Sequence, residues 1–192
     1  MAIAAHAVVL LLALTVGSDE SNPNPAATPA PPKAAPCSTR EHRQFDFWLG
    51  EWNVAGKNGQ PAGTNRITRV LGGCALRAEW MSRGGHPGTS LNVYDAATRR
   101  WRQTWVDDRG GVLLLEGGLR DGSMVLEGER PADSGGGRVT NRIVWTPLSG
   151  GRVRQHWQSS TDGKTWNEEF DGIYSKAKNL ASRSAPPASG SR

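Results

Sequence analysis

The sequence predicts an all-β fold, an antiparallel up-and-down β-barrel of about ten strands with a short helical plug on its N-terminal side. Apolar and polar residues alternate in runs of about eight residues, the pattern of a strand with one buried face. Turn signals such as Asn58-Gly59, Asp121-Gly122 and Asp162-Gly163 separate these runs and favour tight hairpins. A meander of this kind has two exposed sheet edges, and closure into a barrel removes them.

The ends of the chain differ in composition from its middle. Residues 2–17 are almost entirely apolar, but the run is short for a membrane span, which needs about 20 residues. We expect residues 1–18 to be a secretory signal peptide, with an uncleaved anchor or a mis-assigned start as alternatives. Residues 19–36 and 177–192 have the composition of a disordered linker and a disordered tail. The barrel domain should therefore span residues 37–176, and the mature protein should be secreted or periplasmic with no membrane insertion.

The alternating runs give the strands in chain order. Each run ends at a Gly-rich, Asn-Gly or Asp-Gly segment, so each strand should pair with the next one through a short turn. The expected strands are residues 50–55, 64–70, 75–82, 89–94, 100–106, 112–119, 123–129, 139–146, 152–158 and 166–174.

A cluster of rings precedes the first expected strand. Residues 44–52 (QFDFWLGEW) hold four aromatic side chains in nine positions. Ser38 and Glu41 have the spacing of a capping box, with Ser38 as the N-cap. Phe45, Trp48 and Leu49 then fall on one helical face. This pattern predicts a short helix that places its rings against one mouth of the barrel, where their burial is favourable.

The chain contains two cysteines, Cys37 and Cys74. In an exported protein an even number of cysteines indicates a disulfide, which would tie the start of the domain to an early strand. Two buried thiols are the alternative if the protein is not exported.

The formal net charge of the chain is +5. Basic proteins often bind nucleic acids or anionic surfaces, but the arginines here are scattered among acidic residues rather than clustered. We therefore expect a solvated basic surface and no nucleic-acid partner. The sequence leaves the oligomeric state open.

The inner faces of several expected strands combine tryptophan with an amide side chain. Period-two alternation places Gln103 with Trp101 and Trp105, and Gln155 with Trp157. These groups either bond to one another and to internal water, or they line a cavity for a small, partly apolar ligand. Glu168 falls on the predicted inner face with Trp166, Phe170 and Tyr174. The candidate ligand-binding residues are Trp48, Trp52, Trp101, Gln103, Trp105, Asn141, Trp145, Gln155 and Trp157.

Signals for catalysis and for metal binding are weak. No nucleophile elbow is present, and nothing pairs the strand carboxylates as a glycoside hydrolase requires, so no catalytic residue is assigned. The histidines lack the spacing of a zinc site. His156 alone is a candidate axial ligand for haem, although alternation places it opposite Trp157, on the outer face.

Four segments carry a resemblance to a known family. Residues 45–52 (FDFWLGEW), 73–76 (GCAL), 101–107 (WRQTWVD) and 163–166 (GKTW) resemble a bacterial exported family of unknown function that is thought to be lipocalin-like. The resemblance implies a calycin-type barrel and no established activity. Trp48-Leu49-Gly50-Glu51-Trp52 is also similar to the opening segment of nitrobindin-type barrels, which implies haem held by a histidine on a late strand.

These observations lead to one main functional hypothesis and two alternatives. The first is a lipocalin-like barrel that binds a small-molecule ligand without a resident cofactor. The alternatives are a haem-binding protein that uses His156, and a non-catalytic structural or interaction module of the cell envelope whose barrel is filled.

Overall fold

The computed structural model describes residues 35–132 and 135–177. The expected signal peptide, most of the expected linker and almost all of the expected tail lie outside these ranges. Within them, no helix has the length and apolar character needed to cross a membrane.

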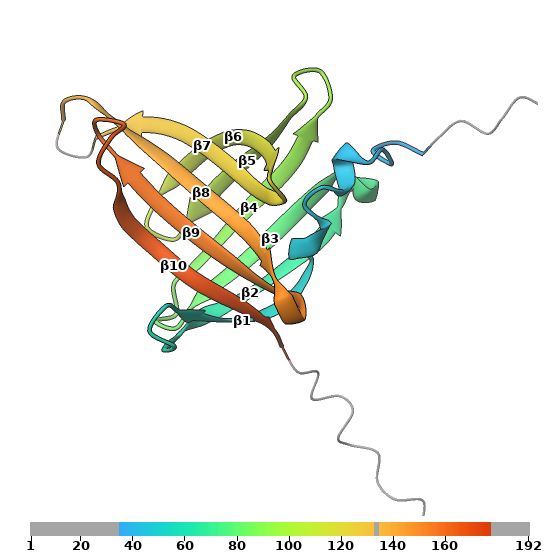
Figure 1. Cartoon of the computed structure of the whole chain (residues 1–192), viewed down its shortest axis with the longest axis horizontal. Coiled ribbons are helices and arrows are strands. Elements are labelled where there is room, and N and C mark those ends of the chain that lie inside the picture. Colours follow the sequence, from blue (N-terminus) through green and yellow to red (C-terminus); the bar gives the residue numbers. More distant parts are fainter. Residues whose placement is uncertain (1–34, 133–134, 178–192) are drawn as a thin grey trace, which may run out of the picture. The chain divides into compact units, whose positions relative to one another are not determined.

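Ten antiparallel strands form a closed barrel in which each strand pairs with the next and β10 pairs with β1 (Figure 1). The predicted up-and-down barrel is therefore confirmed, and each expected strand is present. The strands are β1 (Gly50–Gly56), β2 (Pro61–Val70), β3 (Ala75–Ser82), β4 (Pro87–Asp95), β5 (Arg100–Asp107), β6 (Val112–Arg120), β7 (Ser123–Pro131), β8 (Arg138–Leu148), β9 (Arg152–Ser160) and β10 (Asn167–Lys176).

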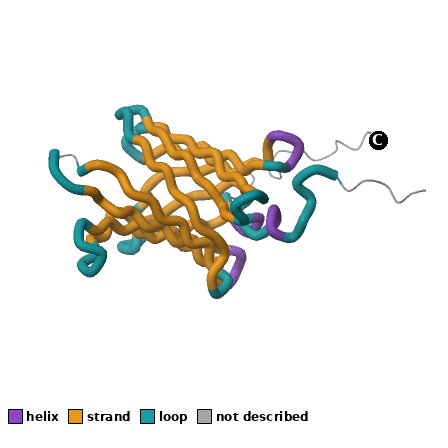
Figure 2. Tube along the Cα trace, turned by 90° about the horizontal axis from the view of Figure 1, so that it is seen from above, coloured by secondary structure: helices purple, strands orange, loops and turns teal. Residues whose placement is uncertain are grey.

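The connections alternate between the two ends of the barrel because consecutive strands run in opposite directions. At one end lie the 3₁₀ turns η1 (Glu41–Arg43), η2 (Asp46–Trp48), η3 (Leu71–Gly73) and η4 (Ser149–Gly151). Figure 2 shows these short helical turns gathered at that end. We call η1 and η2, residues 41–48, the plug, and the barrel end opposite to it the open end.

The plug forms, but its N-terminus differs from the prediction. η1 begins after Arg40, which makes no side-chain capping bond. Ser38 Oγ instead donates to the carbonyl oxygen of Ala35 at 2.7 Å, so the predicted capping box is wrong. A capping box stabilises the first turn of an α-helix, whereas this segment makes two separate 3₁₀ turns.

The rings of the plug fill one end of the barrel. Phe45 is fully buried and stacks on Trp48 with a centroid distance of 5.0 Å. The edges of Trp101 and Trp145 approach Phe45 at 5.7 and 5.2 Å. Burial of each such side chain stabilises the fold by roughly 1.5–3 kcal/mol. The plug end of the barrel is therefore packed core.

A disulfide between Cys37 and Cys74 joins the segment before the plug to the turn between η3 and β3. Arg43 reinforces this link, because its guanidinium donates to the carbonyl oxygens of Cys37 and of Gly73, the latter at 3.1 Å. The predicted disulfide is thus present, and it holds the plug against the barrel.

The inward faces of β5 and β9 follow the predicted alternation. Trp101 and Gln103 are buried while the residues between them are exposed. β10 departs from the prediction because a bulge between Glu168 and Phe170 shifts its register against β9. Glu168 therefore lies on the outer face, bonded to Lys57. Trp166 precedes the strand and packs under the guanidinium of Arg142, so the inner positions predicted for Glu168 and Trp166 are wrong.

Candidate ligand-binding site

A cavity of about 190 Å³ lies inside the barrel between the plug and the open end. Trp48 and Trp145 border it on the plug side, and Leu113 and Ile143 contribute aliphatic wall. Aromatic rings from four strands surround its mouth towards the open end: Trp80 (β3), Trp105 (β5), Trp157 (β9) and Phe170 (β10). The barrel is thus filled at one end and hollow towards the other.

Six of the nine side chains predicted from the sequence border this cavity. They come from the plug and from β5, β8 and β9, and the closed barrel brings them together. That they bind a ligand stays a prediction. The six are Trp48, Gln103, Trp105, Trp145, Gln155 and Trp157.

The other three predicted residues do not border the cavity. Trp52 donates from Nε1 to the carbonyl oxygen of Trp48 at 2.9 Å, inside the packed core. Trp101 packs edge-on against Phe45 at the plug end. Asn141 accepts a hydrogen bond from Trp157 Nε1 at 2.9 Å and so orients that ring. Alternation along a strand gives the face of a residue but not its depth in the barrel.

Several side chains of the cavity were not predicted from the sequence. Trp80 follows the same two-residue period as buried Leu76 and Ala78, so β3 carried a signal for it. Glu169 gave no such signal, because only the bulge in β10 turns it towards the cavity. The remaining missed residues are Asn65, Ser90, Leu113, Ile143, Phe170 and Tyr174.

Three rings at the mouth lie against inward-facing glycines. Trp80 covers Gly63, Trp105 covers Gly88, and Phe170 covers Gly172. A Cβ atom at Gly88 would lie 2.3 Å from the Trp105 ring, and one at Gly172 would lie 2.4 Å from the Phe170 ring. Rings this close to the backbone lie along the barrel wall, which leaves the centre of the mouth open.

One side of the cavity carries a satisfied amide network. Gln103 Nε2 donates to Asn92 Oδ1 at 2.6 Å, and Asn92 Nδ2 donates to Ser90 Oγ at 3.0 Å. Asn92 Nδ2 also reaches the carbonyl oxygen of Leu76 at 3.2 Å. These amide and hydroxyl groups therefore bond to one another. This is one of the two arrangements that the sequence predicted for the inner polar side chains, the other being a ligand cavity.

A second network surrounds Tyr174. Its hydroxyl donates to Gln155 Oε1 and accepts from Asn65 Nδ2 at 3.4 Å. Burial raises the pKa of the Tyr174 phenol, which keeps it neutral at physiological pH.

Three polar atoms of the cavity residues are buried without a hydrogen-bond partner in the described part of the protein. They are the indole donors Trp48 Nε1 and Trp145 Nε1 and the acceptor Asn65 Oδ1. An unsatisfied buried group of this kind costs about 1–3 kcal/mol.

Glu169 is the only carboxylate or cationic side chain among the described residues that border the cavity. Ser159 Oγ donates to its Oε1 at 2.5 Å. A single carboxylate does not supply the facing pair that glycoside hydrolysis requires. The local charge is also opposite in sign to the net charge of +5.

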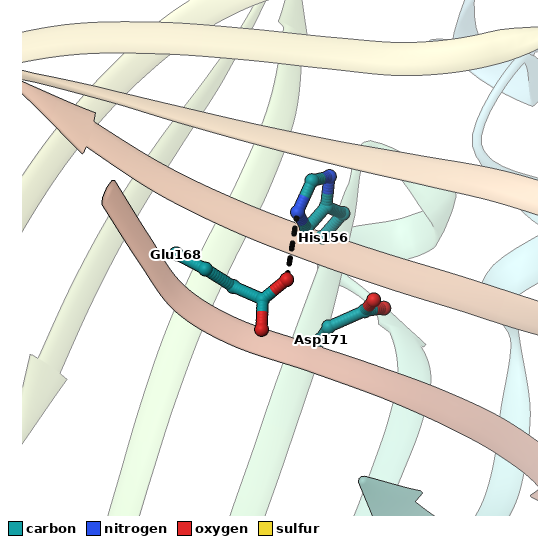
Figure 3. A group of neighbouring side chains, drawn as sticks. All are labelled: His156, Glu168 and Asp171. Atoms are coloured by element: carbon teal, nitrogen blue, oxygen red, sulfur yellow. Dashed lines mark ion pairs between the residues drawn. The ribbon is translucent and has the colours of Figure 1, made fainter. Parts of the chain in front are cut away.

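The cavity does not fit haem. None of the described residues that border it is a histidine, cysteine or methionine, and its phenol, Tyr174, is buried and hydrogen-bonded. His156 lies on the outer face of β9, where Nε2 is 3.5 Å from Glu168 Oε2 (Figure 3). The outward position predicted for His156 is therefore correct, and it excludes this side chain as a ligand inside the barrel.

His156, Glu168 and Asp171 form a cluster with metal-ligand chemistry on the outer face (Figure 3). Both carboxylates already have cationic partners. Lys57 Nζ lies 2.5 Å from Glu168, and Arg154 makes two hydrogen bonds to Asp171, at 2.8 and 2.7 Å. The hydrogen bond from Arg154 is the main reason that the pKa of Asp171 is lowered. The cluster is therefore a network of ion pairs, in which Lys57 and Arg154 balance the charges of the two carboxylates.

A second, shallower depression of the open end shares Trp80 and Trp105 with the cavity. His86 Nδ1 lies 3.0 Å from Asp108 Oδ2 there, and Ser82 Oγ accepts from the backbone N–H of His86 at 2.9 Å. His86 is about half exposed, so this group lies in contact with solvent. The depression extends the aromatic mouth outwards over the turns of the open end.

No protein-family model matches the chain, and no curated protein matches its sequence. The closed ten-strand barrel is compatible with a lipocalin-like fold. Membership of the exported family that the motifs resemble stays a prediction.

Proposed function

We propose that this barrel binds a small, largely apolar molecule that carries a hydrogen-bonding group, and that it does so outside the cytoplasm. The observation that carries the proposal is the aromatic cavity whose bordering residues include three buried polar atoms without partners. Binding pockets combine an apolar lining with a few polar groups in this way.

The size of the cavity limits the ligand. An engineered cavity of about 150 Å³ in another protein holds benzene. The cavity here, about 190 Å³, would take one aromatic ring with small substituents, or the end of a longer molecule that extends through the mouth.

The unpaired atoms limit its chemistry. Trp48 Nε1 and Trp145 Nε1 would donate to an acceptor on the ligand, and Asn65 Oδ1 would accept from a donor. A hydroxyl or amide group provides both functions. Each bond of this kind contributes about 0.5–1.5 kcal/mol net, and it also removes the cost of an unsatisfied group.

The proposed location rests on the disulfide between Cys37 and Cys74. Such bonds form and persist in oxidising compartments and are rare in the cytosol. The disulfide supports the secreted or periplasmic location expected from the sequence.

Calorimetric titration with 4-methylphenol, a neutral ring with one hydroxyl, tests the proposal. Leu113→Trp fills the cavity from β6, while Leu114→Trp places the same ring on the outer face, where Leu114 is 63% exposed. We expect binding with a negative heat-capacity change in the wild type and in Leu114→Trp, and loss of binding in Leu113→Trp.

Ile143→Phe serves as a second filled variant if Leu113→Trp does not fold. Absence of binding in the folded wild type would contradict the proposal and favour the structural or interaction module. Equal affinity in a folded, filled variant would show that the probe binds elsewhere.

A further inference from the structure

We infer that the cavity selects an organic cation, a molecule whose alkylated ammonium group lies at the mouth between the aromatic rings and Glu169. This inference rests on the proposed function and specifies the chemical class of its ligand. It depends on the rings that border the mouth, on the sign of the local charge and on the bulge that positions the carboxylate.

The rings at the mouth lie close to the barrel wall. Trp105 lies against the backbone of Gly88, and Phe170 lies against Gly172, and both rings border the cavity. The face of an aromatic ring carries the negative part of its quadrupole and attracts a cation placed over it. Glycine at these wall positions therefore lets the rings stay at the wall and leaves room for a cation between them.

The rings also approach one another across the mouth. Trp80 in β3 and Phe170 in β10 have centroids 6.2 Å apart and an interplanar angle of 75°, although β1 and β2 separate their strands. Trp157 is held by its hydrogen bond to Asn141. Several rings arranged around one point are the recognised solution for binding a quaternary ammonium group.

Glu169 adds a full negative charge to the rings. The bulge in β10 allows consecutive residues, Glu169 and Phe170, to border the cavity together. Ser159 Oγ fixes one carboxylate oxygen by a hydrogen bond at 2.5 Å. A carboxylate and an aromatic wall both stabilise a cation, and both disfavour a fatty-acid or other anionic ligand.

The charge of the whole molecule does not explain this local sign. The chain carries a net charge of +5, yet no lysine or arginine among the described residues borders the cavity itself. Arg109 borders the depression that extends the mouth, together with the carboxylates of Asp107 and Asp108. Neighbouring cations lie on the outer face of the barrel in ion pairs, as Arg142 does with Glu127 and Arg154 with Asp171. Within the described part of the chain, the cavity of this basic protein is thus bordered by a single charged side chain, the exposed carboxylate of Glu169.

The test compares phenyltrimethylammonium with tert-butylbenzene, its neutral counterpart of the same shape, in calorimetric titrations of the wild type. We expect the cation to bind about tenfold more tightly. Glu169→Gln should lower the affinity for the cation by about two- to fivefold, because this carboxylate is exposed to solvent, and leave that for tert-butylbenzene unchanged. Glu168→Gln is the matched control, because Glu168 is adjacent in sequence but lies on the outer face, and it should change neither affinity.

The outcomes separate the inference from the proposed function. If tert-butylbenzene binds as tightly as the cation, the inference is wrong while the cavity still binds ligands. If neither probe binds but 4-methylphenol does, the inference is wrong and the proposed function stands; if 4-methylphenol does not bind either, both fail. A cation preference that survives Glu169→Gln unchanged would overturn the role of this carboxylate. Added salt provides a check without mutation, since it should weaken only the binding of the cation.

Discussion

The indole of Trp105 lies against the backbone of Gly88, so closely that a Cβ atom at position 88 would come within 2.3 Å of the ring. The two residues sit on neighbouring strands, where Trp105 pairs with Ser90 and Gly88 pairs with Asp107. This contact keeps the Trp105 ring along the wall. A residue without a side chain in β4 thereby preserves the space at the mouth.

Gly88→Ala should push the Trp105 ring towards the cavity and reduce ligand binding. We expect a loss of roughly 1–3 kcal/mol in the free energy of unfolding, the range found when a packed site is overfilled. Titration with 4-methylphenol and urea unfolding measure the two effects. Gly118→Ala in β6 is the control, because a Cβ there meets no atom within 4 Å. Equal affinity in Gly88→Ala and the wild type would contradict this role for Gly88.

The strands were predictable because hairpin turns and two-residue periods are local properties of the sequence. The depth of a side chain along the barrel axis is not a local property, because it depends on where the plug and the other strands lie. Trp101 and Trp105 lie on the same face of β5, four residues and roughly 13 Å apart along the strand. The first is packed against the plug and the second borders the mouth. Nothing in the strand pattern indicates where the plug ends and the cavity begins.

The bulge in β10 marks the second limit of sequence-based prediction. One extra residue reverses the faces of all positions on one side of it. The sequence correctly placed Phe170 and Tyr174 inside, beyond the bulge, but it placed Glu168 inside as well. The carboxylate that borders the cavity is its neighbour, Glu169. A bulge depends on pairing with β9, which is a long-range interaction.

Replacement of both Cys37 and Cys74 by serine should destabilise the barrel by up to about 4 kcal/mol in the chain-entropy model. The bond closes a loop with a sequence separation of 37. Guanidinium unfolding of the variant, and of the wild type with and without reductant, measures the effect. The Arg43 bonds to the carbonyl oxygens of Cys37 and Gly73 persist without the disulfide, so the plug should stay docked in the folded state. A variant as stable as the oxidised wild type would contradict this prediction.

Phe45→Ala should remove the centre of the ring cluster and cost about 3–5 kcal/mol of stability, the usual range for a fully buried phenylalanine. Its contacts with Trp48, Trp101 and Trp145 are all lost in this variant. Phe47→Ala is the matched comparison in the same plug, and a smaller loss is expected because Phe47 is only partly buried. Urea unfolding followed by tryptophan fluorescence compares them. Equal losses would show that the plug is not anchored through Phe45.

The turn between β9 and β10 should lose local stability in strong acid. Asp162 Oδ1 accepts from the backbone N–H groups of Thr165 and Lys164, at 2.7 and 2.8 Å, and these bonds lower its pKa from the ordinary value of 3.8 to about 2. Because the folded-state pKa is the lower one, the contribution of Asp162 to stability is complete above pH 3.8. It is lost as the pH falls towards about 2. Carbon NMR of the Asp162 carboxyl should show this titration midpoint.

Hydrogen exchange of the Lys164 and Thr165 amides, which donate to Asp162, also reports the protonation of this carboxylate. Protection of both amides should fall as Asp162 is protonated, because a neutral carboxyl accepts hydrogen bonds less strongly than a carboxylate. Asp162→Asn is the control, because the amide oxygen of asparagine accepts hydrogen bonds but does not titrate. In this variant the protection of the Lys164 and Thr165 amides, corrected for the intrinsic exchange rate, should be constant over this pH range. A midpoint near 3.8 in the wild type would mean that the turn does not hold the carboxylate as the structure shows.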